Sequence, residues 1–274
     1  MEPFVLFNDQ VVEKEKVCIS PFDRGVIFGD GVFTTILIEN GKPVFFDAHQ
    51  KRLHEQAKSL HIKAPLIAKE HIYDLIAKNN ARFGNYRLKI VIMGGSVDVK
   101  GFEKRQAGAL FGFLEPYEKK NKPLRVSIYP DPVETPIARF KTLSYLHRFI
   151  LFDWAKERGV DECLIKNSEG ILLEGVFSNF FWTCESNFYY PDPRLPLLHG
   201  ITIQALQKIA ENLGMQAKPV KAGLDQIPQE AHIFLTNSLM GFLPVTEIDN
   251  KQFPRNPHLE KVLKENFERY KAKY

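Results

Sequence analysis

The chain has 274 residues, of which 44% are hydrophobic and 26% charged, so it can form two modest domains with buried cores. The formal net charge of +4 is spread along the chain and not gathered into a basic arm, which disfavours nucleic-acid binding. The chain opens with no basic region followed by an apolar stretch, and no run of about 18 apolar residues occurs, so we predict neither a secretion signal nor a membrane span.

The cysteines and histidines exclude two further classes of protein. Cys18, Cys163 and Cys184 are far apart and form no CxxC or Cys/His ligand spacing. The eight histidines show no HxxxH or comparable spacing on one helix. We therefore predict a cytoplasmic protein without a metal site.

The first part of the chain mixes strands and helices. The runs FVLFN and FTTILIEN predict strands, and Asn40-Gly41 before PVFF predicts a hairpin. Asp47 can cap a helix whose apolar residues recur at helical spacing over 53–60, and a second helix is expected over about 67–78. RLKIVIM and ALFGFL predict two more strands.

The charged segment EPYEKKNKP contains two prolines and no apolar periodicity. It predicts a linker at 116–123 between an N-terminal domain, 1–115, and a C-terminal domain, 124–274. LRVSIY then predicts a strand, and a helix from about Ser144 to Arg158 is expected to stop at Gly159.

Four short runs, ECLIKN, ILLEG, SNFFWT and NFYYP, predict an antiparallel meander. ITIQALQKIAENLG is the clearest amphipathic helix, and Gly214 provides its stop. AHIFLT predicts a strand, and a last helix is expected from about Pro257.

One helix start is a candidate anion site. Gly200 stands directly before the helix, so the backbone N–H groups of Ile201 and Thr202 can point at a phosphate, although such a glycine more often only forms the turn. Arg52 is a candidate partner, because a guanidinium binds two phosphate oxygens at once.

Two charged residues are candidates for catalysis. Lys141 lies between Phe140 and Leu143, where burial would lower its pKa and make it a good imine former. Glu174 ends the run ILLEG, and a buried carboxylate there would need a cationic or proton-donating partner.

Six motifs stand in order between Asp23 and Val245: DRGVIFGDGVFTT, HQKRL, KTLSYL, EGVFSNFFW, LLHGIT and LTNSLMGFLPV. Together they resemble the fold-type IV pyridoxal-phosphate family, which contains branched-chain and D-amino-acid aminotransferases and aminodeoxychorismate lyase. The resemblance implies an α/β (α+β) enzyme with a small N-terminal domain, a larger C-terminal domain with an antiparallel barrel-like core, and pyridoxal 5'-phosphate between them. It also implies a homodimer that acts on a small amino-acid-like substrate.

By this resemblance, Lys141 binds the cofactor as an imine and moves protons at the substrate α-carbon, while Glu174 pairs with the pyridine nitrogen. The phosphate contacts carry over to Arg52, Ile201 and Thr202. Further cofactor contacts carry over to Tyr145 and Asn237.

The reaction is predicted from two motifs. GDGVFTT and LTNSLMGFLPV resemble the lyase forms of the family, and Thr35 would then assist proton transfer. The leading hypothesis is therefore 4-amino-4-deoxychorismate lyase, which releases pyruvate and leaves p-aminobenzoate for folate synthesis. A branched-chain or D-amino-acid aminotransferase is the alternative, and a noncatalytic relative that binds pyridoxal phosphate or a protein partner is the third.

One position departs from the family pattern. Relatives often have an arginine next to glycine where this chain has Met93-Gly94-Gly95, so an expected carboxylate-binding arginine is missing. We predict that Lys100 replaces it, as a flexible point charge without the two-pronged geometry of arginine.

Overall fold

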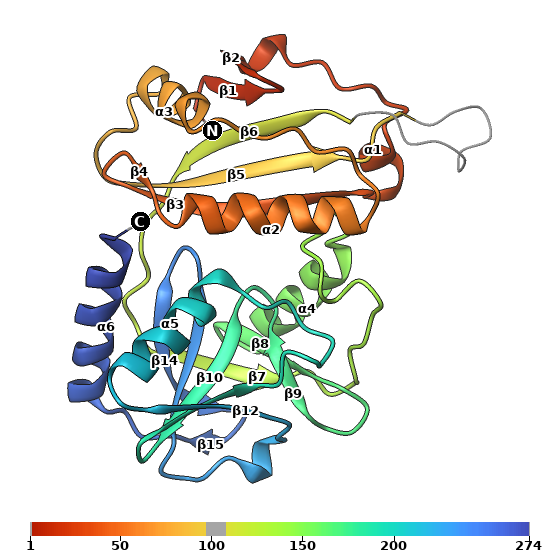
Figure 1. Cartoon of the computed structure of the whole chain (residues 1–274). Helices are drawn as coiled ribbons and strands as arrows, with labels where there is room; N and C mark the ends of the chain where they lie inside the picture. Colours follow the sequence, from red (N-terminus) through yellow and green to blue (C-terminus); the bar gives the residue numbers. More distant parts are fainter. Residues whose placement is uncertain (1, 97–107, 274) are drawn as a thin grey trace. The chain divides into compact units, whose positions relative to one another are not determined.

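The computed structural model describes residues 2–96 and 108–273. The chain folds as two compact units, Met1–Lys119 with Phe140–Tyr145, and Lys120–Arg139 with Leu146–Tyr274 (Figure 1). The segment that contains Lys141 thus groups with the first unit, whereas the sequence-based boundaries placed it in the domain 124–274. The sequence could not show this, because the grouping depends on pairing with a strand more than a hundred residues earlier.

The described residues of the first unit form a six-stranded sheet with two long helices. Its elements are β1 (Phe4–Phe7), β2 (Gln10–Glu13), a 3-10 turn (Lys14–Lys16), α1 (Arg24–Phe28), β3 (Gly31–Glu39), β4 (Lys42–Pro43), α2 (Phe46–Ser59), α3 (Lys69–Lys78), β5 (Asn85–Met93) and β6 (Leu110–Pro116). The strand order is β2-β1-β6-β5-β3-β4, and each neighbouring pair is antiparallel.

The alternation of side chains along β3 gives this sheet two different faces. Val32, Ile36 and Ile38 point into a core that also contains apolar residues of α2 and α3. Phe33 points the other way and packs with Val91 of β5 in a smaller cluster. Lys141 lies against this second face, next to the Phe33 ring.

Two local predictions for this unit have different outcomes. Asn40 and Gly41 both have positive φ (48° and 76°), as a two-residue hairpin turn requires, so the predicted hairpin is confirmed. Asp47 was expected to cap α2, but Phe45 holds the N-cap position. Asp47 lies in the first turn of α2 and accepts a hydrogen bond from Lys69 Nζ at 2.8 Å. The strand PVFF is also shorter than predicted, because α2 already begins at Phe46.

The second unit contains nine strands, three helices and a short 3-10 turn. Its elements are β7 (Leu124–Ile128), α4 (Leu146–Glu157), β8 (Glu162–Lys166), β9 (Leu172–Gly175), β10 (Asn179–Cys184), β11 (Asn187–Pro191), α5 (Ile201–Asn212), β12 (Gln216–Val220), a 3-10 turn (Leu224–Gln226), β13 (His232–Asn237), β14 (Gly241–Ile248), β15 (Lys251–Gln252) and α6 (Pro257–Lys271). Positive φ at Gly159 and Gly214 ends α4 and α5 as predicted.

The sheet of this unit is mixed and curled. Its strand order is β12-β11-β10-β13-β14-β7-β8-β9, with β15 beside β14, and β9 also contacts β10, so the sheet bends back on itself. The predicted meander is only partly right: β8–β9 and β10–β11 are antiparallel pairs, but β10 pairs with β13 instead of β9. Three pairs, β11–β12, β14–β7 and β7–β8, are parallel. Short strands with similar composition do not determine their partners locally, which is why the sequence missed this order.

Candidate functional site

The segment that carries Lys141 is fixed against β3. Phe33 N donates to Lys141 O at 2.9 Å, Leu143 N donates to Gly31 O at 3.0 Å, and Val32 forms a bridge with Thr142. From the other side, Gln56 of α2 accepts a hydrogen bond from Lys141 N at 3.0 Å. The backbone of Lys141 is therefore held by a strand and a helix that both lie far from it in the sequence.

The Lys141 amine lies beside two aromatic residues. Its Nζ donates to the Tyr145 hydroxyl at 3.1 Å and lies 4.6 Å from the centroid of the Phe33 ring. Phe33 and Tyr145 themselves meet edge to face, with centroids 5.0 Å apart. The rings orient the lysine side chain and lend it cation–π attraction.

A second lysine, Lys89 on β5, shares this face of the sheet. Its Nζ lies 4.5 Å from the Phe33 centroid, and burial, together with the charge of Arg87, lowers its pKa. Thr35 lies directly opposite Lys89 in the β3–β5 pairing, so both side chains point to the face of Phe33. The sequence-based prediction missed Lys89, although a lysine in the apolar run RLKIVIM was the available signal.

The other face of β3 carries a buried polar group around Arg52. Thr34 Oγ1 lies 2.7 Å from His49 Nδ1 and accepts a hydrogen bond from Arg52 Nη2 at 3.2 Å. Burial, followed by the charges of Arg52 and Lys141, holds the pKa of His49 well below its usual value, so the ring is neutral. The Thr34 hydroxyl therefore links the neutral His49 ring to the Arg52 guanidinium.

Arg52 stays charged in this setting. Burial lowers its pKa to about 10, and Tyr145 opposes that shift. His49, Arg52 and Gln56 repeat at helical spacing, so one face of α2 fixes both the guanidinium and the backbone of Lys141. Arg52 was predicted from its motif, whereas Thr34, His49 and Gln56 were not.

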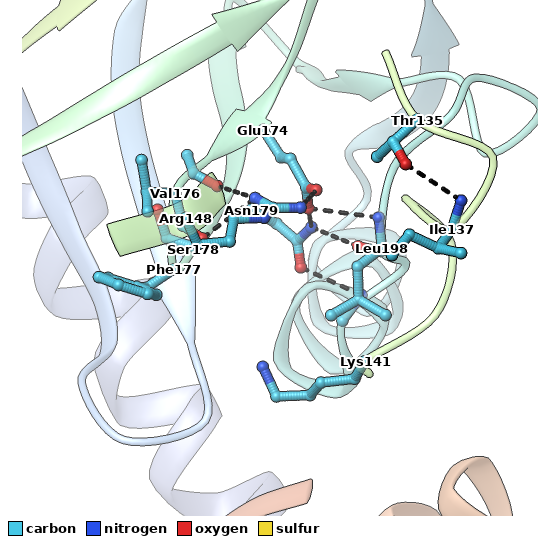
Figure 2. Close-up of polar contacts among 12 residues, drawn as sticks. Thr135, Ile137, Lys141, Arg148, Glu174, Val176, Phe177, Ser178, Asn179 and Leu198 are labelled. Atoms are coloured by element: carbon cyan, nitrogen blue, oxygen red, sulfur yellow. Dashed lines mark hydrogen bonds and ion pairs between the residues drawn. The ribbon is translucent and has the colours of Figure 1, made fainter. Parts of the chain in front are cut away.

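In the second unit, Glu174 is buried in a polar network (Figure 2). Its Oε1 accepts a hydrogen bond from Arg148 Nη2 at 2.6 Å, and Oε2 accepts longer bonds from Asn179 Nδ2 at 3.4 Å and Leu198 N at 3.3 Å. The prediction that a buried Glu174 needs a cationic partner is met here by Arg148, which the sequence did not identify.

The same network leads to the start of α5. Asn179 Nδ2 donates to Leu198 O at 2.6 Å, and Asn179 Oδ1 accepts from Gly200 N at 3.0 Å. A Cβ on Gly200 would lie 2.0 Å from Asn179 Oδ1, so only glycine fits. Asn179 therefore joins the carboxylate of Glu174 to the helix start.

The first turn of α5 has the features of an anion site. Gly200 holds the N-cap position, and no side chain among the described residues caps the helix. Ile201 and Thr202 occupy the first turn, both buried, so their N–H groups lie at the positive end of the helix dipole. Next to them, His199 has a pKa lowered by burial, and its Nε2 is buried without a partner in the part of the chain that the structure describes.

Asn237 stabilises the turn between β13 and β14. Its Oδ1 accepts from Leu239 N and Met240 N, each at 3.0 Å, and its Nδ2 donates to Phe177 O at 3.2 Å. These bonds fix the turn and tie it to the chain after β9. Its predicted contact with the cofactor stays a prediction.

The position of the missing arginine is sterically closed. Gly94 N donates to Asp30 O at 2.8 Å, and a Cβ on Gly94 would lie 2.8 Å from both the main chain and the carboxylate of Asp30. That carboxylate is paired with Arg24 Nε at 2.6 Å. The suggested substitute, Lys100, lies outside the described residues.

The structure thus gathers the predicted residues other than Asn237 and Lys100 into two groups, one in each unit. Lys141, Tyr145 and Thr35 share the Phe33 face of β3. Arg52 reaches Thr34 from α2 and is close enough to Tyr145 for the two groups to interact electrostatically. Glu174, Ile201 and Thr202 are linked through Asn179. Within 2–96 and 108–273, no cluster of metal-ligating side chains and no helix able to cross a membrane is found.

Comparison with known proteins identifies the family. Residues 31–248 match the model of amino-transferase class IV, so the chain belongs to this family. It is 28% identical to a candidate branched-chain-amino-acid aminotransferase of Methanocaldococcus jannaschii, over 98% of this chain and 97% of that protein. It is 27% identical to aminodeoxychorismate lyase of Bacillus subtilis, over 91% of this chain and 88% of that protein.

A solved structure confirms the fold class. The crystal structure of a candidate 4-amino-4-deoxychorismate lyase from Legionella pneumophila matches 92% of this chain and 97% of its own, with a TM-score of 0.84 and 27% identity. The protein is therefore a pyridoxal-phosphate-dependent enzyme of lyase or aminotransferase type.

The residues present fit this cofactor. Pyridoxal phosphate needs an amine for its aldehyde, an acid–base partner for its ring nitrogen and a site for its phosphate. The described residues offer Lys141, the buried carboxylate of Glu174, and both Arg52 and an uncapped helix start.

Proposed function

We propose that the protein is 4-amino-4-deoxychorismate lyase, which cleaves its substrate to pyruvate and p-aminobenzoate. The observation that carries this choice is the placement of Thr35. Its side chain lies on the face of β3 that carries Phe33, and Lys141 Nζ lies beside the Phe33 ring on that face. A threonine there can relay protons without adding charge. The 27% identity to the Bacillus subtilis lyase supports the same choice.

Four groups would hold the cofactor. Lys141 would bind its aldehyde carbon through Nζ, and Glu174 would accept a hydrogen bond from its ring nitrogen. Arg52 and the backbone N–H groups of Ile201 and Thr202 would hold its phosphate. When bound, pyridoxal phosphate supplies an electron-withdrawing ring that makes the substrate α-proton acidic.

Lys141 would also be the proton carrier of the reaction. Its Nζ would take the α-proton of the substrate and return a proton to the departing pyruvate. The hydrogen bond to the Tyr145 hydroxyl holds this amine in place between the two steps, and Thr35 would assist the second transfer. The rings of Phe33 and Tyr145 pack beside the amine and orient it.

Lys89 would bind a carboxylate of the substrate. Its ammonium lies on the same strand face as Thr35, and Lys89 is half-buried, which lowers its pKa and makes an anionic ligand there favourable. The closed position at Gly94 leaves no room for an arginine in that role. Lys100 stays a second candidate on sequence grounds.

An aminotransferase for branched-chain or D-amino acids is the second candidate. It is favoured by the 28% identity to the Methanocaldococcus jannaschii protein over nearly the whole chain. The two activities would use the same Lys141 and Glu174. They would differ in the substrate that the enzyme accepts and in the form of the cofactor at the end of the reaction.

One experiment separates the two activities. We would reconstitute the protein with pyridoxal phosphate, add enzymatically generated aminodeoxychorismate and quantify p-aminobenzoate, with Lys141→Ala as the control. Product that is lost in Lys141→Ala and strongly reduced in Thr35→Val, but retained in Thr35→Ser, would support the lyase. Absence of product, together with stoichiometric conversion of the cofactor to its pyridoxamine form by an amino acid, would refute the lyase in favour of the aminotransferase.

We also propose a homodimer. On α4, the side chains of Leu146, Phe149 and Ile150 are 73%, 54% and 56% exposed and recur at helical spacing, which marks an apolar face that a second copy would cover. Light scattering should give twice the mass of the chain. Ile150→Glu should shift this mass toward the monomer, whereas the control Glu157→Lys on the same helix should not.

A cytoplasmic location is proposed from the cysteines. All three are free in the structure, and Cys163 is buried with a pKa raised to about 12 by burial. Unpaired thiols suit a reducing compartment.

A further inference from the structure

Arg148 is a buried, charged residue that has no role in the proposed reaction. Its side chain is 8% exposed, and the side chain of Glu174, its partner, is 4% exposed. Arg148 Nη2 donates to Glu174 Oε1 at 2.6 Å, while Nη1 donates to the carbonyl oxygens of Gly175 at 3.2 Å and Val176 at 3.0 Å (Figure 2). Buried ion pairs contribute little net stability compared with apolar residues of similar size, so stability alone does not account for this pair.

The two oxygens of Glu174 are held differently. Oε1 takes the short, charge-assisted bond from Arg148. Oε2 accepts the longer bonds from Asn179 and from the backbone of Leu198, at 3.4 Å and 3.3 Å. A ring N–H that approached Oε2 would therefore replace or supplement these two longer bonds and would leave the bond from Arg148 intact.

We infer that Arg148 is a positioning residue that keeps the Glu174 carboxylate charged and turned, so that Oε2 is presented to the pyridine nitrogen of the cofactor. This inference rests on the proposed role of Glu174. A carboxylate this deeply buried is costly to keep charged without a cation, and a protonated Glu174 would offer a donor where the ring nitrogen needs an acceptor. Arg148 supplies that cation before the cofactor arrives.

A purely structural role of Arg148 predicts a different result. If Arg148 serves only to hold the carbonyl groups of Gly175 and Val176, its loss weakens the binding of any ligand of this shape to the same extent. If Arg148 acts through Glu174, its loss weakens the binding only of a ligand that carries a ring nitrogen.

The test compares two ligands on the full-length apoprotein: pyridoxal phosphate and its 1-deaza analogue, in which a C–H replaces the ring nitrogen. The native protein should prefer pyridoxal phosphate by roughly tenfold or more, the size of one charge-assisted hydrogen bond. Arg148→Gln should remove most of this preference, and Arg148→Lys should keep part of it. Arg125→Gln, at an exposed arginine of the same unit, should leave it unchanged.

A double-mutant cycle adds a sharper criterion. Glu174→Leu, which leaves no hydrogen-bonding group at this position, should abolish the preference, and adding Arg148→Gln to it should cause no further change. An unaltered preference in Arg148→Gln overturns the inference and leaves the cofactor assignment standing. A native protein that binds pyridoxal phosphate with no preference over the analogue instead overturns the role of Glu174 itself.

A second measurement does not require an altered Arg148. The infrared difference spectrum between native apoprotein and Glu174→Gln should show the loss of an ionised carboxylate band. If the band lost is that of a protonated carboxyl group, Arg148 does not keep Glu174 charged and the inference is wrong.

Discussion

Replacing Thr34 with valine should weaken both the fold of the first unit and its hold on phosphate. Thr34 and His49 are each 1% exposed, and the threonine hydroxyl links His49 Nδ1 at 2.7 Å to Arg52 Nη2 at 3.2 Å. Valine has nearly the same shape, so the effect comes from the lost hydroxyl and not from a cavity. A buried polar group that loses its hydrogen-bond partner costs about 1–3 kcal/mol, so we expect a loss of about 2 kcal/mol in the free energy of unfolding.

The assay is urea unfolding of the apoprotein, with the slope compared between variants to confirm that only stability changed. Thr35→Val is the matched control, since it makes the same change on the opposite face of β3, where the described residues show no hydrogen bond to that side chain. Thr34→Ser should recover most of the loss. Equal stability of Thr34→Val and Thr35→Val would refute the reasoning.

The same variants report on Arg52. If Thr34 aims the guanidinium at the cofactor phosphate, Thr34→Val should lower the preference for pyridoxal phosphate over pyridoxal, which lacks the phosphate, by roughly tenfold. An unchanged preference would mean that Arg52 holds its position without Thr34.

Three other substitutions probe separate parts of the first unit. Lys89→Met should raise KM for the substrate by roughly 10- to 100-fold with a much smaller change in kcat, measured by steady-state kinetics, because a charged contact is lost. Gly94→Ala should destabilise the fold by about 1–3 kcal/mol through the clash with Asp30, whereas Gly112→Ala, where a Cβ meets only ordinary contacts at 3.5 Å, should cost less. Because the folded-state pKa of His49 is lowered, its contribution to stability is present above about pH 6.5 and is lost as the pH falls below that value, and His49→Gln should reduce this acid sensitivity in unfolding measurements.

The sequence by itself determined the elements with strong local signals. The Asn40-Gly41 turn, the helix over Ile201–Asn212 and the glycine stops at Gly159 and Gly214 depend on neighbours a few residues apart, so patterns in the chain were enough. The family was also within reach, because six motifs in a fixed order identify it more strongly than any single motif.

Only the tertiary structure decided which side chains meet. Lys141 is fixed by β3 and by Gln56, and Lys89 reaches the Phe33 ring from another strand. Arg148 and Glu174 lie 26 residues apart, and nothing in either local sequence indicates the pairing. A buried charge needs polar partners, and long-range packing decides which residues these are, so no local periodicity in the sequence indicates them.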